Sequence, residues 1–163
     1  MKIEFENKYA RLALISITVT MLITSIHHVY RLGLGLLIPA LVLTVLPYAL
    51  MRWYSSSKNE NILKSFSLFS ALMFLWFGFI DGFMDHVFKA LGLPNTTFLP
   101  GSDAEVVKTV FSLGSPAASN IFYEGTGILT FAVGVFAMVY VVKMIQTKHA
   151  ADKIAGQLKP AQS

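Results

Sequence analysis

Four long apolar segments, separated by polar stretches, set the pattern of this chain. They cover about residues 12–30, 32–51, 66–91 and 121–142. A helix needs roughly 20 apolar residues to cross about 30 Å of hydrocarbon, and each segment has about that length. The second segment, "LGLGLLIPALVLTVLPYALM", carries no charge, and its Pro39 and Pro47 are compatible with a helix in lipid. The pattern predicts an all-α integral membrane protein, an antiparallel four-helix transmembrane bundle.

The last connection, about residues 92–119, is long enough to hold an element of its own. Within it, "SDAEVVKTVFSLG" (102–114) places Ser102 as an N-cap, Glu105 at the capping-box position and Gly114 as a stop. The apolar face of such a helix would consist of Val106, Val107, Val110 and Phe111. We therefore expect a short surface helix in this loop.

Composition supports the membrane class and removes several chemistries. Of the 163 residues, 55% are hydrophobic and only 13% are charged, whereas about 25% of a soluble domain is charged. The net charge is +4, but the basic residues are scattered singly, so nucleic acid is not an expected partner. Cysteine is absent, which excludes disulfides, thiolate nucleophiles and iron–sulfur clusters.

The distribution of basic residues predicts the orientation. Ten of the 13 would lie on one side, namely Lys2, Lys8, Arg11, Arg52, Lys58, Lys64, Lys143, Lys148, Lys153 and Lys159. The other three are Arg31, Lys89 and Lys108. By the positive-inside rule both termini are cytoplasmic, in a plasma or inner membrane. We expect one transmembrane domain over 1–148 and a polar cytoplasmic tail over 149–163.

Ionisable side chains gather at one predicted depth. The inner ends of three helices are marked by Arg11, Lys64 and Lys143. Counting about 20 residues outward, at roughly 1.5 Å each, places the outer boundary near Arg31, Met84 and Tyr123. Three histidines and three carboxylates then fall in one layer at the extracytoplasmic face: His27, His28, Asp81, Asp85, His86 and Glu124.

Helical periodicity indicates that these groups face the protein interior. The first segment carries a polar stripe formed by Ser16, Thr20, Thr24, His27, His28 and Arg31. Lipid does not accommodate such a stripe, so it should face neighbouring helices. In the third segment Asp81 and Asp85 are one turn apart, and in the fourth Glu124 shares a face with Gly127 and Gly134.

Imidazoles and carboxylates on several helices are typical of a metal site in a bundle. The candidate ligands of a divalent Zn, Fe or Mn ion are His27, His28, Asp85, His86 and Glu124. Around them, Asp81, Arg31 and Tyr123 would orient the ligands. If the site catalyses a reaction, the candidate acid–base groups are Asp81, Glu124 and His86; catalysis, transport and sensing all stay open. The ordinary alternative is an i,i+4 ion pair between Asp85 and Lys89.

Three other functions fit the same residues. The layer could bind a lipid-like or small-molecule ligand, or carry acid–base chemistry, without a metal. His86 with His27 or His28 could ligate haem b, although three acids beside the macrocycle make this less favourable. The polar groups could also join helices in an accessory or assembly subunit, within a homo-oligomer or a larger membrane complex. No phosphate loop, nucleotide fingerprint or hydrolase elbow is present.

Overall fold

The computed structural model describes residues 8–96 and 99–157, and all regular structure in those residues is helical. The elements are α1 (Lys8–Leu32), the 3₁₀ turn η1 (Leu34–Leu36), α2 (Leu37–Ser57), α3 (Glu60–Met73), the π-helix η2 (Phe74–Val87), α4 (Phe88–Ala90) and α5 (Pro116–Gln157). Four helical stretches are long and apolar enough to cross a membrane: Lys8–Leu32, Leu34–Ser57, Glu60–Ala90 and Pro116–Gln157. The prediction of an all-α chain with four such helices is confirmed.

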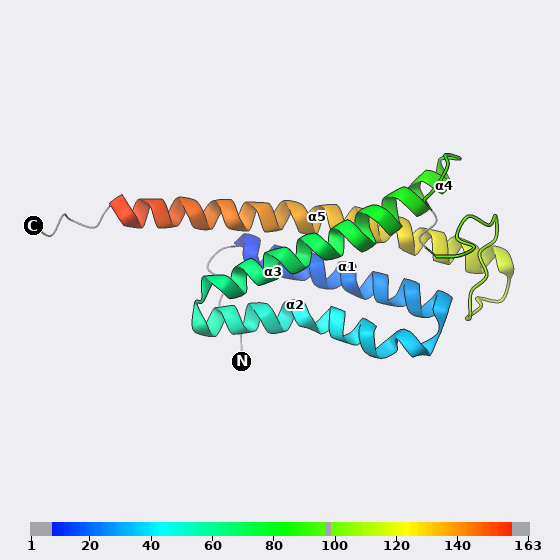
Figure 1. Ribbon diagram of the computed structural model, residues 1–163, viewed down its shortest axis with the longest axis horizontal. Helices are drawn as coiled ribbons and strands as arrows, with labels where there is room; N and C mark the ends of the chain where they lie inside the picture. The colour runs from blue at the N-terminus through cyan, green and yellow to red at the C-terminus, as the bar shows by residue number, and fades with distance from the viewer. Residues whose placement is uncertain (1–7, 97–98, 158–163) are drawn as a thin grey trace, which may run out of the picture.

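The four stretches run alternately in opposite directions along the molecule (Figure 1). Helix α1 packs against both α2 and α5, η2 packs against α5, and α3 packs against α2. Of the four stretches, the first is the most buried within the protein and the second the least. Helix α1 is therefore central, while α2 turns most of its apolar surface outward.

Local capping explains where two of the helices meet. Helix α2 ends at Lys58, which adopts a left-handed conformation with φ 55°. Asn59 then caps α3, because its side-chain oxygen accepts a hydrogen bond from the Asn61 amide at 2.9 Å. This cap starts the third helix at Glu60, several residues before the apolar segment that indicated it.

Helix α5 is much longer than a membrane requires. Its 42 residues correspond to about 63 Å at roughly 1.5 Å per residue. Residues 149–157 of the expected polar tail belong to this helix, and residues 158–163 lie outside the described part of the chain.

An apolar core fills the end of the molecule where α1 begins and α5 ends, which we call the terminal end (Figure 1). Its fully buried members include Ala13, Ile17 and Phe66, packed with Ala137 of α5. Burial of this kind contributes about 25 cal/mol for each Å² of apolar surface removed from water. The opposite end, where residues 91–115 connect η2 and α4 to α5, we call the loop end.

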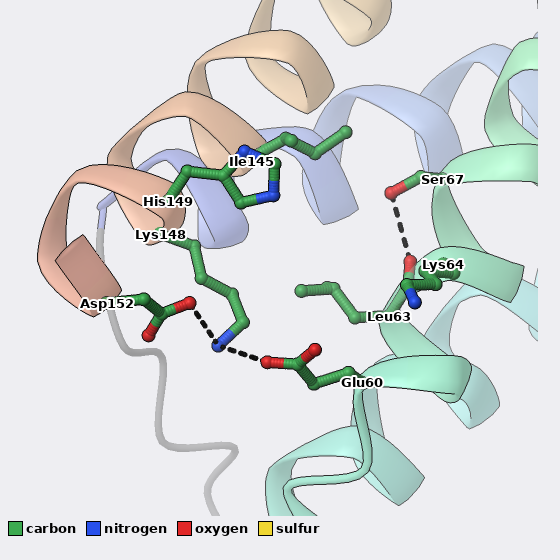
Figure 2. Close-up of a pocket in the computed structure, with 8 residues that line it drawn as sticks. All are labelled: Glu60, Leu63, Lys64, Ser67, Ile145, Lys148, His149 and Asp152. Carbon is green, nitrogen blue, oxygen red and sulfur yellow. Dashed lines mark hydrogen bonds and ion pairs between the residues drawn. The ribbon is translucent and has the colours of Figure 1, made fainter. Parts of the chain in front are cut away.

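A pocket of 330 Å³ also lies at the terminal end, between α3 and α5 (Figure 2). Lys148 points across it and forms ion pairs with Glu60 at 3.3 Å and Asp152 at 3.4 Å. Both carboxylates are largely exposed, so each pair contributes about 1 kcal/mol or less. None of the candidate metal ligands lines this pocket.

The expected surface helix over 102–114 is wrong, because the structure has turns and irregular backbone there. The backbone amides of Val110 and Phe111 donate instead to the carbonyls of Arg31 and Tyr30, at 3.0 and 3.2 Å. The Val107 amide donates to the Asn120 side chain at 3.0 Å, and Val107 itself is buried. Bonds to α1 and α5 thus satisfy the amide groups that a local helix would have used.

Candidate metal centre

The candidate centre lies at the loop end, between α1, η2 and α5. His27 and His28 come from the last turns of α1, and Asp81, Asp85 and His86 come from η2. The exposed fractions of His27, Asp81, Asp85 and His86 are only 1–2%. The depth and face arguments therefore placed these residues correctly relative to one another.

Asp81 is at the centre of the group. Its Oδ2 atom lies 4.0 Å from Nε2 of His27 and 4.0 Å from Nε2 of His28. Potential ligand atoms of Asp81, Asp85 and His86 form a second set, also within 4.8 Å of one another. Two three-residue sets that could each hold a metal ion thus share one carboxylate.

The π-helix explains how one segment supplies three ligands. Its wider turn, with hydrogen bonds from i to i+5, changes the spacing at which side chains align, so Asp81, Asp85 and His86 are all buried. Two glycines permit the close approach of η2 to α5. A Cβ atom on Gly82 would lie 2.9 Å from the Gly127 carbonyl oxygen, and one on Gly127 would overlap the His86 ring.

Hydrogen bonds favour the same tautomer in two of the three histidines. His28 Nδ1 donates to the Thr24 carbonyl at 3.0 Å, and His86 Nδ1 donates to the Glu124 carboxylate at 2.7 Å. In a neutral ring with Nδ1 protonated, Nε2 presents a lone pair. His27 Nδ1 lies 2.9 Å from the Thr126 hydroxyl, which can donate or accept.

Four buried atoms of this group have no hydrogen-bond partner. They are Nε2 of His27, His28 and His86, and Oδ2 of Asp85. Buried polar atoms are nearly always paired in native proteins, and leaving one unpaired costs about 1–3 kcal/mol. All four are potential metal-ligand atoms. A single cation would satisfy several of them at once.

The carboxylates around the centre differ in whether a lysine or arginine compensates their charge. The Glu124 carboxylate accepts from Lys89 Nζ at 2.6 Å, so this acid already has a counter-charge. Among the described residues, no lysine or arginine nitrogen lies within 4.0 Å of the carboxylate oxygens of Asp81 or Asp85. Two carboxylates in a buried layer are costly unless positive charge compensates them.

The connection between η2 and α5 closes the centre at the loop end. Lys89 Nζ donates to the carbonyls of Ser102 and Ala104 as well as to Glu124. Arg31 donates to the Pro100 carbonyl at 2.8 Å and to the Tyr123 hydroxyl. From the same connection, the Asn95 amide donates to Asp85 Oδ1 at 2.6 Å. Charged side chains thus hold the loop backbone directly over the histidines.

Tyr123 and Arg31, expected from the sequence to orient the ligands, lie beside the centre. Tyr123 is fully buried, and its ring stacks on His27 with 4.2 Å between centroids. Because Arg31 donates to the Tyr123 hydroxyl, the ring cannot rotate freely away from His27.

Three acids and one lysine have contacts in the structure that differ from those expected from the sequence. Asp81, expected beside the ligands, lies within both sets of potential ligand atoms. Glu124, expected as a ligand, instead accepts from His86 Nδ1 and Lys89 Nζ. Lys89 therefore pairs with Glu124, and Asp85 pairs with Asn95 rather than with Lys89.

The expected haem alternative has little space. The rings of His27 and His86 meet edge to face, with only 4.8 Å between their centroids. His27 and His28 are similarly close, at 5.0 Å. The contact between His27 and His86 leaves no gap for a macrocycle between these two imidazoles.

Sequence reasoning missed Asn95, Thr126 and the Thr24 carbonyl as partners of the ligands. Thr126 follows Glu124 by two residues, so on an ordinary helix the two side chains lie about 200° apart and share no face. Asn95 lies beyond the last helical turn, where periodicity carries no information. Only their contacts reveal them.

Comparison with protein families, with curated proteins and with solved structures finds no match. The class must therefore rest on fold and site alone. They define an all-helical chain with four helices able to cross a membrane and a buried His/Asp group that could hold a metal ion.

Proposed function

We propose that this chain is an integral membrane protein that holds one divalent Zn, Fe or Mn ion near the extracytoplasmic face and uses it in membrane-embedded catalysis. The observation that carries the proposal is the common orientation of the three histidines. Each ring has a partner at Nδ1 and a buried, unpaired Nε2, and the Nε2 atoms of His27 and His28 lie 4.0 Å from Asp81. Metal-bound histidines in proteins have this arrangement almost without exception.

The proposed ligands are drawn from the two overlapping sets, His27 and His28 with Asp81, and Asp85 and His86 with Asp81, so that Asp81 is common to both. Imidazole nitrogens with one or two carboxylates suit Zn and Fe, and carboxylates also suit Mn. The two negative charges of the carboxylates match the two positive charges of the ion. Glu124 would act through His86, since a carboxylate that accepts from Nδ1 raises the basicity of Nε2.

Catalysis fits the surroundings better than conduction of an ion through the bundle. A continuous ion path would need polar groups along the whole length of the helices. The described residues at the terminal end instead form an apolar core that includes Ile17, Phe66 and Ala137. A resident ion can polarise a substrate oxygen or activate a water molecule.

The extracytoplasmic location rests on the charge distribution. Ten basic residues would lie on the side of the termini and three on the side of the site. The same count supports a plasma or inner membrane with both termini in the cytoplasm.

Metal analysis of the purified full chain tests the proposal. We expect about one equivalent of Zn, Fe or Mn per chain, and loss of it in His86→Ala with the helices still folded by circular dichroism. His149→Ala is the matched control, because His149 is the fourth histidine and lies exposed on α5, far from the site. Wild-type protein that stays metal-free after incubation with each ion, and gains no thermal stability from any of them, would refute the proposal.

A further inference from the structure

A groove of 210 Å³ lies beside the candidate metal centre, between α1, α2 and η2. Its wall includes Thr24, Ser25, His28, Ala40, Leu43 and Phe77. It is distinct from the pocket in Figure 2, which lies at the terminal end. His28 is the one candidate ligand that lines the groove.

His28 connects the groove to the centre. Its Nε2 lies 4.0 Å from Asp81, while its ring contacts Phe77 with 5.3 Å between centroids. The His28 side chain is 13% exposed, against 1% for His27 and for His86. The His28 ring therefore borders both the groove and the metal group, with its Nε2 atom buried on the side of Asp81.

Apart from His28 Nε2, which has no partner, the side-chain hydroxyls of the groove wall already have hydrogen-bond partners. The Ser25 hydroxyl donates to the Ala40 carbonyl at 3.2 Å and lies 3.1 Å from the Thr44 hydroxyl. The Thr24 hydroxyl is directed toward Thr130 of α5, at 3.5 Å. Water remains in a buried site only where it finds 2–4 polar partners, so this wall favours an apolar occupant.

The position of the groove determines where that occupant comes from. Its wall includes Leu36, Pro39 and Leu43 of the stretch Leu34–Ser57, which is apolar enough to cross a membrane, and Pro39 is exposed. At the loop end, by contrast, Arg31 and Lys89 hold the connecting backbone over the centre. The open approach to His28 is thus sideways, from the hydrocarbon of the bilayer.

We infer that this groove admits the hydrocarbon part of a small molecule dissolved in the bilayer and brings its reactive end to the ion beside His28. An apolar cavity of about 150 Å³ in another protein binds benzene, so 210 Å³ accommodates one ring or a short chain segment. The inference rests on the proposed metal function and adds to it the substrate class, an apolar membrane-soluble molecule.

Benzotrifluoride, a ring-sized apolar probe with a fluorine signal, tests the inference with the full chain in phospholipid nanodiscs. We expect ¹⁹F–¹H Overhauser effects from the probe to the rings of His28 and Phe77 in wild-type protein, with or without metal. In protein loaded with Co²⁺, the probe signal should broaden relative to protein loaded with Zn²⁺. Ala40→Phe, which fills the groove, should lose both signals, whereas Ala49→Phe on the exposed side of the same helix should keep both.

The outcomes separate this inference from the metal proposal. Absence of the Overhauser effects in wild-type protein would overturn the groove as a binding site, whatever the metal content and whether or not the variants fold. Equal Co²⁺ broadening in wild type and Ala40→Phe would overturn the groove as the route to the ion. Overhauser effects in a protein that binds no metal would support the apolar groove and refute the metal function.

Discussion

Gly127 of α5 gives the sharpest test of how the centre is built. A methyl group at this position would overlap three atoms of the His86 ring, namely Cγ, Cδ2 and Nε2. The ring cannot simply turn aside, because its Nδ1 is bonded to Glu124 and its edge contacts both His27 and Tyr123. Gly127→Ala therefore forces His86 out of its position.

Two opposing terms set the expected size of the effect on stability. Alanine is better than glycine in a helix by about 1 kcal/mol. Overpacking of a well-filled site costs about 1–3 kcal/mol, and loss of a hydrogen bond to a charged group, such as that between His86 and Glu124, removes a further 1.5–3 kcal/mol or so. We expect Gly127→Ala to lower the free energy of unfolding by about 2–5 kcal/mol in total.

The metal affinity should change more clearly than the stability. Displacing His86 removes one proposed ligand, so we expect a loss of metal affinity of at least the tenfold to hundredfold range that is typical when only a supporting residue is changed. Thermal unfolding in detergent and competitive titration with a chromogenic chelator measure the two effects.

Gly125→Ala is the matched control on the same helix. Gly125 is exposed, and a Cβ atom there has no neighbour within 4 Å. This variant should keep its metal and unfold at or slightly above the wild-type temperature. If Gly127→Ala matches Gly125→Ala in both measurements, the contact between Gly127 and His86 does not build the site.

Three further predictions follow from the same contacts. Glu124→Gln should weaken metal binding by about tenfold to hundredfold without unfolding the protein, whereas Glu105→Gln in the exposed loop should have no effect in the same chelator titration. Metal retention in equilibrium dialysis should be full at neutral pH and fall toward about pH 5, because histidines and carboxylates must lose their protons to bind an ion; retention that is constant over this range would contradict histidine ligation. In intact cells, an impermeant thiol reagent should label Asp103→Cys but not Ser57→Cys, two exposed positions in a chain without cysteine; the reverse pattern would invert the orientation.

Counting residues along three predicted helices was enough to predict that most residues of the centre lie in one layer. The relevant distances depend only on a fixed rise per residue and on the hydrocarbon thickness, so His27, His28, Asp81, Asp85 and His86 could be assigned to one layer without knowledge of the packing. The structure brings these five side chains into two overlapping sets. The four helices that are long and apolar enough to cross a membrane followed from the same arithmetic.

Other features of the fold and the site could not be predicted from the sequence, because they depend on tertiary contacts that sequence periodicity does not show. The π-helix differs from an α-helix in which carbonyl each amide finds, and the glycines that permit it gave no distinct pattern. The segment 102–114 carried good helix signals, yet α1 and α5 offered its amides other partners. Glu124 lies next to the centre, as predicted, but the side chain of Lys89 is long enough to reach it from α4.

The π-helix and the unpaired ligand atoms point to the same conclusion. Such a helix has poorer hydrogen-bond geometry than an α-helix and usually extends over a single turn at functional sites. Here it continues through Phe74–Val87 and buries two carboxylates. Its backbone would be more stable as an α-helix, and its acids would be more stable in water. If a divalent ion binds as proposed, ligation by Asp81, Asp85 and His86 would offset both costs at once, because the three side chains must converge to hold it. On that proposal, the irregular helix is the part of the fold that ion binding would select.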